Sequence, residues 1–148
     1  MANFATVPAL IPGHIYCGGA NDIQQMVDED GIDVVVDLRA EATGCATHHP
    51  EVQWVHIPLS DHAEEPEEQL FRDAILAVVD AYQNGHKVAF HCGAGRGRTG
   101  TVAAGVLLEL KISKTVPEAV ERAKSIRPVF NIKPIQYQAL GLLYPEPD

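Results

Sequence analysis

The segment from Lys87 to Leu110 constrains the fold of this chain more than any other part of the sequence. Lys87–His91 (KVAFH) has the character of a buried strand. A turn from Cys92 to Arg98 follows, and three of the five residues between these two are glycine. From about Thr99 to Leu110 the apolar residues recur with helical spacing. A strand joined by a tight turn to a helix predicts an α/β protein.

The rest of the chain continues this alternation of strands and helices. Further strands are predicted at Ile15–Cys17, Asp33–Leu38 and Gln53–Ile57, and further helices at residues 22–30, 67–83, 115–127 and 134–143. Residues 1–13 are expected to form an extended lead-in. We therefore predict a single domain over residues 1–148, with a central, mostly parallel sheet flanked by helices on both faces. Sheets of this kind bind ligands at the carboxyl ends of their strands.

Length and composition exclude several classes of protein. The 148 residues are 46% hydrophobic and 21% charged, as in globular domains rather than disordered or fibrous chains. The longest apolar run, Val102–Leu108, is too short to span a membrane. Three cysteines do not make a disulfide framework, and no basic residue precedes Arg39, as a signal or transit peptide would need. We expect a cytoplasmic monomer with reduced thiols.

The net charge of −9 is distributed unevenly along the chain. Residues 1–86 carry fifteen acidic and two basic side chains, whereas residues 87–148 carry five acidic and nine basic ones. The overall acidity argues against nucleic acid or an anionic membrane as a partner. A site for a small anion is therefore expected in the last 62 residues.

The glycine-rich turn has three interpretations. Gly95-x-Gly97-x-x-Gly100 matches the dinucleotide-binding pattern, but only helices follow it, where that fold needs a second strand with an acidic residue. A nucleotide P-loop needs Lys-Ser/Thr after the glycines, which the sequence lacks. The third interpretation is an anion nest, in which backbone N–H groups point inward beside a helix N-terminus. Only the nest accounts for the glycines, the cysteine and the arginine together, which an inert buried thiol would leave unexplained.

Cys92, Arg98 and Thr99 give this nest its chemistry. Arg98 can clamp two oxygens of a tetrahedral dianion in bidentate geometry. Positive surroundings favour the thiolate of Cys92, and a thiolate at the base of an oxyanion cradle can attack phosphorus in line. Thr99 can hydrogen-bond the sulfur and make it a better leaving group. The other predicted phosphate-binding residues are His91, Gly93, Ala94, Gly95, Arg96 and Gly97.

The pattern His91-Cys92-x5-Arg98-Thr99-Gly100 resembles the signature loop of the cysteine-dependent protein tyrosine phosphatases, and the chain length is similar to that of their compact dual-specificity type. The resemblance extends from about Ile15 to Leu143. It implies hydrolysis of a phosphorylated protein or another phosphomonoester in two steps, through a phosphocysteine and without metal or other cofactor. It also implies that His91 supports the loop and tunes the thiol, and that Thr99 helps to release phosphate.

The reaction also needs a proton donor for the leaving oxygen and then a base for water. Phosphatases of this type supply an Asp from a loop upstream of the cysteine. Asp61 lies 31 residues before Cys92, in a polar loop after a predicted strand. It is therefore the predicted acid, with Glu64 and Glu65 as alternatives slightly further along.

The substrate class stays open at this stage. A basic residue at Arg96 resembles the loop of phosphoinositide 3-phosphatases, and Asp61-His62 resembles their acid loop. These two features favour a multiply charged substrate. The glutamates that follow Asp61 are expected to repel such a substrate.

Residues outside the loop add further expectations. Arg39 and Glu41 resemble a family segment that braces the loop. Arg127 and Gln136 resemble late elements of the family, but their spacing departs from the usual pattern, so no role is assigned to them. Cys45 could pair with Cys92 on oxidation, because reactive thiolates oxidise easily. A metal site is not expected, because the ligand candidates lack paired spacing; they are Cys45, His48, His49, His56 and His62.

We therefore predict a small phosphatase of dual-specificity type, in which Cys92 is the nucleophile, Arg98 the phosphate clamp and Asp61 the acid and then the base. An alternative within this fold is a phosphatase of phosphoinositides or small phosphate esters. A catalytically silent phosphate-binding protein is a rival from another class, weakened because nucleophile, clamp and acid are all present. A rhodanese-type sulfurtransferase also uses a loop cysteine, but the Arg-Thr-Gly ending and the six acidic residues of Asp61–Asp73 fit a phosphatase better.

Overall fold

A five-stranded sheet in the order β1-β2-β5-β3-β4 forms the centre of the molecule, in a computed structural model that describes residues 9–146. The strands are β1 (Ala9–Ile11), β2 (Ile15–Gly19), β3 (Val34–Arg39), β4 (Gln53–Leu59) and β5 (Val88–Cys92). Only β1 runs antiparallel to its neighbour. The predicted mostly parallel α/β sheet is confirmed.

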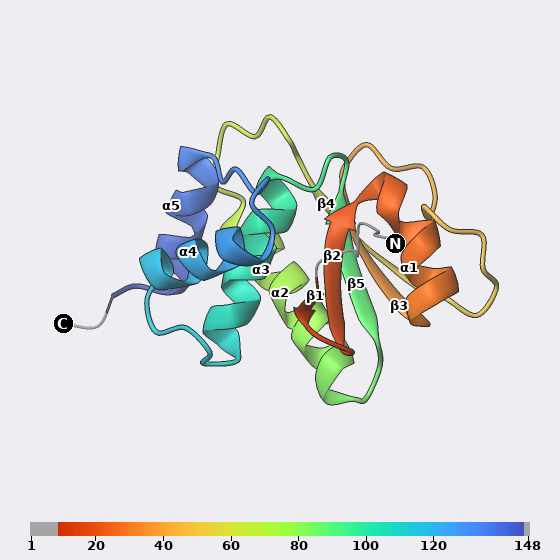
Figure 1. Ribbon diagram of the computed structural model, residues 1–148. Coiled ribbons are helices and arrows are strands. Elements are labelled where there is room, and N and C mark those ends of the chain that lie inside the picture. The colour runs from red at the N-terminus through yellow and green to blue at the C-terminus, as the bar shows by residue number, and fades with distance from the viewer. Residues whose placement is uncertain (1–8, 147–148) are drawn as a thin grey trace.

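Helices cover both faces of this sheet, as predicted (Figure 1). One face is covered by α1 (Ile23–Asp30), which follows a short 3₁₀ turn over Ala20–Asp22. The other four helices pack on the opposite face; they are α2 (Glu68–Gln83), α3 (Gly97–Glu109), α4 (Val116–Ile126) and α5 (Pro134–Leu143). Local signals set their ends: α1 stops at Gly31, where φ is 71°, and Thr115 accepts a hydrogen bond from the Glu118 N–H at the start of α4.

Two apolar clusters form the core, one on each face of the sheet. The larger cluster lies under α2–α5 and includes the fully buried rings of Phe71, Phe90 and Phe130. The smaller cluster lies under α1 and includes Met26 and Val35. The central strands β3 and β5 contribute to both clusters because successive side chains of a strand point to opposite faces. This double burial explains the continuous apolar character of β3 and β5.

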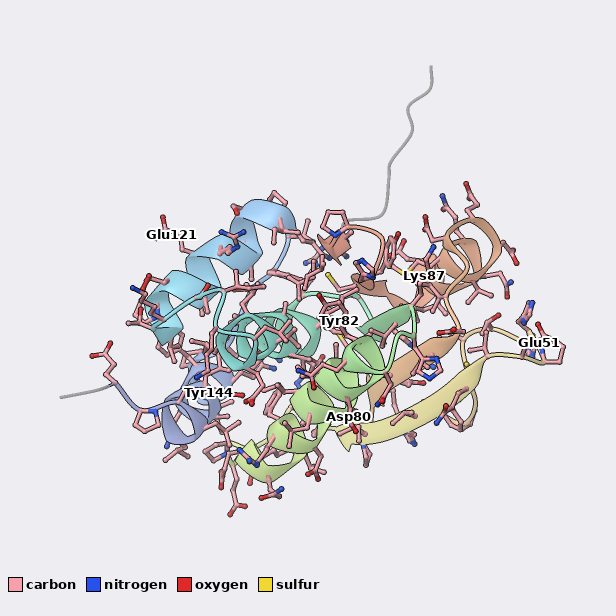
Figure 2. The ribbon with its side chains drawn as sticks, turned by 90° about the horizontal axis from the view of Figure 1, so that it is seen from below. Glu51, Asp80, Tyr82, Lys87, Glu121 and Tyr144 are labelled. Atoms are coloured by element: carbon pink, nitrogen blue, oxygen red, sulfur yellow. The ribbon has the colours of Figure 1, made fainter. Side chains whose placement is uncertain are left out.

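The C-terminal helix is fastened to the helix that follows the glycine-rich turn. Tyr144, just after α5, lies close to α3 in the view of Figure 2, and its hydroxyl donates to Glu109 Oε1 at 2.8 Å. Burial and the neighbouring Glu109 carboxylate raise the pKa of Tyr144 above its usual value. This bond ties the C-terminal end of α5 to the C-terminal end of α3, the helix that carries Arg98 and Thr99.

The structure differs from the sequence predictions at several boundaries; β4, for example, continues to Leu59 rather than ending at Ile57. Part of the expected lead-in, residues 9–11, forms strand β1, and residues 1–8 lie outside the described residues. The strand predicted over Ile15–Cys17 continues through Gly18 and Gly19, which pair with His91 and Cys92 of β5. Helix α3 begins at Gly97 rather than at Thr99. Glycine is needed at the end of β2 because the glycine-rich turn approaches it closely: a Cβ atom on Gly19 would lie 2.9 Å from Gly93 O.

Gly95 shows how close this approach is. A Cβ atom on Gly95 would lie 2.6 Å from both the carbonyl carbon and the carbonyl oxygen of Gly18, and its φ is 72°. Gly13 has a similar φ of 81°, but nothing lies within 4 Å of a Cβ atom there. A substitution at Gly13 therefore adds backbone strain alone, whereas the same substitution at Gly95 adds strain and a steric clash.

We predict that Gly95→Ala lowers the free energy of unfolding by about 3 kcal/mol or more, because the methyl group adds a clash with backbone to left-handed strain. Gly13→Ala is the matched control and should cost about 1 kcal/mol, from strain alone. Urea denaturation of both variants and the unmodified protein measures the difference. Equal losses at the two positions would show that the turn is not crowded against β2.

Candidate active site

The turn between β5 and α3 is held by its carbonyl groups. Gly93 O accepts from Ala20 N at 2.9 Å, and Arg96 O accepts from Asn131 N at 3.2 Å. The guanidinium of Arg127 donates to the two carbonyl oxygens between them, Ala94 O at 3.4 Å and Gly95 O at 3.0 Å. Because a peptide unit is planar and trans, its N–H points opposite to its C=O. The N–H groups of residues 94–97 are therefore turned toward the inside of the turn, as an anion nest requires.

Cys92 lies at the base of this nest. It ends β5, is only 3% exposed, and contributes to a pocket of about 150 Å³. The hydroxyl of Thr99, in the first turn of α3, donates to Cys92 Sγ at 3.0 Å. The sulfur thus lies at the helix N-terminus with a hydrogen-bond donor already in place, an arrangement that suits a thiolate.

Arg98 is buried, and its orientation is fixed by oxygen atoms from β3, β4 and the loop after β3. Its Nη1 and Nη2 donate to the two carboxylate oxygens of Glu41 at 2.8 and 3.0 Å, and Nη1 also donates to Leu59 O at 3.0 Å. Arg98 Nε has no hydrogen-bond partner among the described residues and lies 3.7 Å from Asp61 Oδ1. The side of the guanidinium that carries Nε therefore remains free for an anion in the pocket.

The pKa of Glu41 records the strength of this pairing. Glu41 is exposed on one side, yet the hydrogen bonds and charge of Arg98 lower the pKa of its carboxyl group from 4.5 to about 2. Burial by itself would lower the pKa of Arg98, but the hydrogen bond and charge of Glu41, together with the charges of Cys92 and Asp61, outweigh burial and raise it. Both groups are thus charged throughout the neutral range.

Asp61 is the candidate acid that the structure brings to Cys92. It follows β4 and lines the same pocket as Cys92, Arg96 and Arg98. Lys133, at the start of α5, donates from Nζ to Asp61 O at 2.5 Å and lies 3.5 Å from Asp61 Oδ1. Of the two alternative acids, Glu65 lines an adjoining pocket and Glu64 lines neither of these two pockets.

The other predicted site residues have different places. Ala94, Arg96 and Gly97 line the pocket. His91 was predicted among the phosphate-binding residues, but its side chain is fully buried, and Nδ1 lies 2.9 Å from Cys92 O. His91 therefore lies in the core and does not line the pocket. Gly95 is buried against Gly18.

Residues outside the turn support it. Gln136 Oε1 accepts from Lys133 N at 2.9 Å and lies against Gly97, where a Cβ atom would be 2.9 Å from it. Arg127, to which the sequence analysis assigned no role, holds the turn by donating to the turn's carbonyl groups. Glu41 braces the turn as expected, through its hydrogen bond with Arg98. Lys133 was missed by sequence analysis, although its position three residues before Gln136 could have suggested it.

Residues 9–146 contain no group of three His, Cys, Asp or Glu side chains that could hold a metal ion. Cys45 packs against the smaller core cluster under α1, whereas Cys92 belongs to the larger cluster on the opposite face. The proposed pairing of Cys45 with Cys92 is not formed, and both thiols are free. Over the same residues, no helix is long and apolar enough to cross a membrane.

Comparison with known proteins gives the family. Residues 15–142 match the family model described as "Dual specificity phosphatase, catalytic domain". Human dual specificity protein phosphatase 7 is 30% identical over 130 residues, which are 84% of this chain and 31% of the relative. Rat dual specificity protein phosphatase 6 is 28% identical over 130 residues, which are 84% of this chain and 34% of that relative. The chain therefore spans about a third of the length of the curated relatives it matches.

Solved structures agree on the fold. A mouse putative dual specificity phosphatase complexed with zinc tungstate is 20% identical, with a TM-score of 0.82, covering 97% of this chain and 91% of that one. Human DUSP28 is also 20% identical, with a TM-score of 0.80, covering 92% of this chain and 94% of that one. The predicted α/β phosphatase fold and the predicted family are confirmed. Since the family model covers most of its length, this chain belongs to the family of dual-specificity phosphatase catalytic domains.

Proposed function

We propose that this chain hydrolyses phosphate monoesters of proteins through a phosphocysteine formed on Cys92. One observation carries the proposal: the Cys92 sulfur lies at the base of a turn whose carbonyls are all held outward, in one pocket with Arg98 and Asp61. Membership of the family supports a phosphorylated substrate. The proposal includes a reducing compartment, because the sulfur must remain a thiol to react. It also includes a monomeric protein.

In the first step, the N–H groups of the nest and Arg98 Nε bind the phosphate oxygens. The Cys92 thiolate attacks phosphorus, the bond from phosphorus to the leaving oxygen breaks, and Asp61 gives its proton to that oxygen. The charge that develops on the oxygens faces donors fixed before the substrate arrives, so little reorganisation is needed. Glu41 acts as a positioning residue that keeps Arg98 in this orientation.

In the second step, the Asp61 carboxylate takes a proton from water, and the resulting hydroxide attacks phosphorus as the sulfur–phosphorus bond breaks. Thr99 Oγ1, 3.0 Å from the sulfur, donates to the departing thiolate. The products are inorganic phosphate and the enzyme in its starting state. No further reactant is consumed.

A second candidate substrate class is favoured by the cations of the pocket. Arg96 and Lys133 line it together with Arg98, which exceeds what one phosphate needs. A structural neighbour, PTPMT1, has been solved in complex with PI(5)P, at 19% identity and a TM-score of 0.73. A phosphoinositide or another multiply phosphorylated ester is therefore the alternative to a phosphoprotein.

Relative turnover on three substrates tests the proposed function: a phosphotyrosine peptide, a phosphothreonine peptide and an inositol phosphate. We expect the two peptides to be turned over faster, with no turnover by Cys92→Ser. Faster release from the inositol phosphate would replace the phosphoprotein proposal by its alternative. Binding of phosphate without any turnover would identify a silent phosphate-binding protein.

Asp61→Asn should slow hydrolysis of a phosphotyrosine substrate by about 10²-fold, which is within the range for general acid catalysis. An aryl ester with a much more acidic leaving group should slow less, because that group departs without a proton. The measurement is kcat/KM of the unmodified protein and of Asp61→Asn on both substrates. Glu65→Gln, in the adjoining pocket, is the matched control. Equal losses on the two substrates would mean that Asp61 positions a group rather than donating a proton.

Glu41→Gln should lower kcat/KM by about 10²-fold, because Arg98 loses the charge that fixes its orientation and small misplacements of catalytic groups are costly. Glu121→Gln, an exposed carboxylate on α4 seen in Figure 2, should leave kcat/KM unchanged. A loss below twofold in Glu41→Gln would show that Arg98 is held by Leu59 and the rest of the fold alone.

The same pair makes stability depend on pH. The pKa of Glu41 is about 2 in the folded protein against 4.5 ordinarily, so its contribution to stability is complete above pH 4.5 and is lost as the pH falls toward 2. Urea denaturation of the unmodified protein and Glu41→Gln from pH 7 to pH 3 should therefore show a difference that narrows below about pH 4.5. A difference that widens on acidification would contradict the pairing.

A further inference from the structure

The carboxylate of Asp37 lies in the core beside the histidine that precedes Cys92. Asp37 on β3 and His91 on β5 are register partners in the parallel ladder, and both side chains are fully buried. Asp37 Oδ1 lies 3.8 Å from His91 Nε2. The reaction proposed above gives Asp37 no role, yet a buried carboxylate is costly unless it is paired and hydrogen-bonded.

Asp37 is held in its charged form by neighbours on β3 and β4. Arg39 donates from Nε to Oδ1 and from Nη2 to Oδ2, each at 2.9 Å, and Trp54 donates from Nε1 to Oδ2 at 2.9 Å. Burial alone would raise the pKa of Asp37, but these hydrogen bonds and the nearby His91 outweigh burial and lower it. The carboxylate beside His91 is therefore an anion at neutral pH.

The His91 ring has an acceptor near each of its nitrogen atoms. Nδ1 lies 2.9 Å from Cys92 O, so Nδ1 must carry the hydrogen of that contact. In a neutral ring the lone pair of Nε2 would then face the Asp37 carboxylate, and Nε2 has no hydrogen-bond partner among the described residues. A second proton on Nε2 would replace this unfavourable contact between a lone pair and a carboxylate by an ion pair at 3.8 Å.

Charges of both signs act on the His91 ring. The charged side chains that act on His91 are Asp37, Arg39 and Arg98. Burial lowers the pKa of His91, and the charges of Arg39 on β3 and Arg98 on α3 act in the same direction. The hydrogen bond to the Cys92 carbonyl and the charge of Asp37 raise the pKa of His91, but they do not outweigh burial, so the net shift is downward.

We propose that Asp37 is a positioning residue that acts on Cys92 through His91. Its carboxylate stabilises a second proton on His91, and the imidazolium so formed stabilises the Cys92 thiolate. The proton exchanges with bulk water, and no proton passes between Asp37 and Cys92. The inference rests on the proposed role of Cys92 as nucleophile, but it concerns the thiolate itself and does not require turnover.

The test is the pH dependence of Cys92 alkylation by iodoacetamide, followed by mass spectrometry, since only the thiolate reacts. In Asp37→Asn the midpoint of this curve should move to higher pH by about 1 unit. Direct loss of a negative charge near the sulfur would move the midpoint to lower pH, so the sign identifies the route through His91. An unchanged or lowered midpoint overturns the proposal, and neither result bears on whether the chain is a phosphatase.

Two controls make the route specific. Asp33, immediately before β3, forms an exposed Asp–His pair with His86 at 3.4 Å. Asp33→Asn should leave the midpoint unchanged. In a His91→Asn background, Asp37→Asn should no longer raise the midpoint, because the group through which it acts is gone. The same upward shift in both backgrounds overturns the role of His91.

A measurement on the unmodified protein covers the case in which Asp37→Asn does not fold. Nitrogen chemical shifts of His91 report which ring nitrogens carry a proton. We expect both nitrogens to be protonated while Cys92 is a thiolate, and only Nδ1 after alkylation has removed the sulfur's charge. One proton on the ring in both states overturns the proposal.

Discussion

The outward orientation of the peptide carbonyls between Cys92 and Gly97 is the constraint on which the rest of the site depends. Four carbonyl oxygens in succession accept hydrogen bonds from donors outside the turn. The donors are Ala20, just after β2, and Arg127 and Asn131, in the segment between α4 and α5. Planar peptides then turn the N–H groups inward. The glycines follow from the same constraint, because β2 passes directly beneath the turn and leaves no space for a Cβ atom at Gly95.

Ion pairs fix the side chains around the turn, as the hydrogen bonds fix its backbone. Arg98 is oriented by Glu41, and the buried Asp37 is paired with Arg39, so each buried charge near Cys92 has an opposite charge beside it. The side chains that reach the pocket therefore keep fixed positions without a substrate. Such preorganisation is what electrostatic stabilisation of a transition state requires.

The sequence predicted those parts of the site that are contiguous in the chain or lie at a strand end. Cys92, Arg98 and Thr99 fall within one turn, and Asp61 follows a strand whose carboxyl end had to face the same edge of the sheet. Contacts set by tertiary structure could not be predicted. The partnership of Asp37 with His91 depends on the strand order β5-β3, and Lys133 reaches Asp61 across 72 residues of chain. The strand boundary at Gly18 was wrong because glycine ordinarily weakens a strand, whereas here it permits the close approach of the turn.

The most direct test of the account is the location of the phosphoryl group during turnover. An aryl phosphate is mixed with the protein, the reaction is quenched within one turnover, and peptides are analysed by mass spectrometry. The account predicts one phosphoryl group on Cys92, in larger amount in Asp61→Asn because release to water needs the Asp61 carboxylate as base. Release of inorganic phosphate with no phosphoryl group on Cys92 at any time would contradict it.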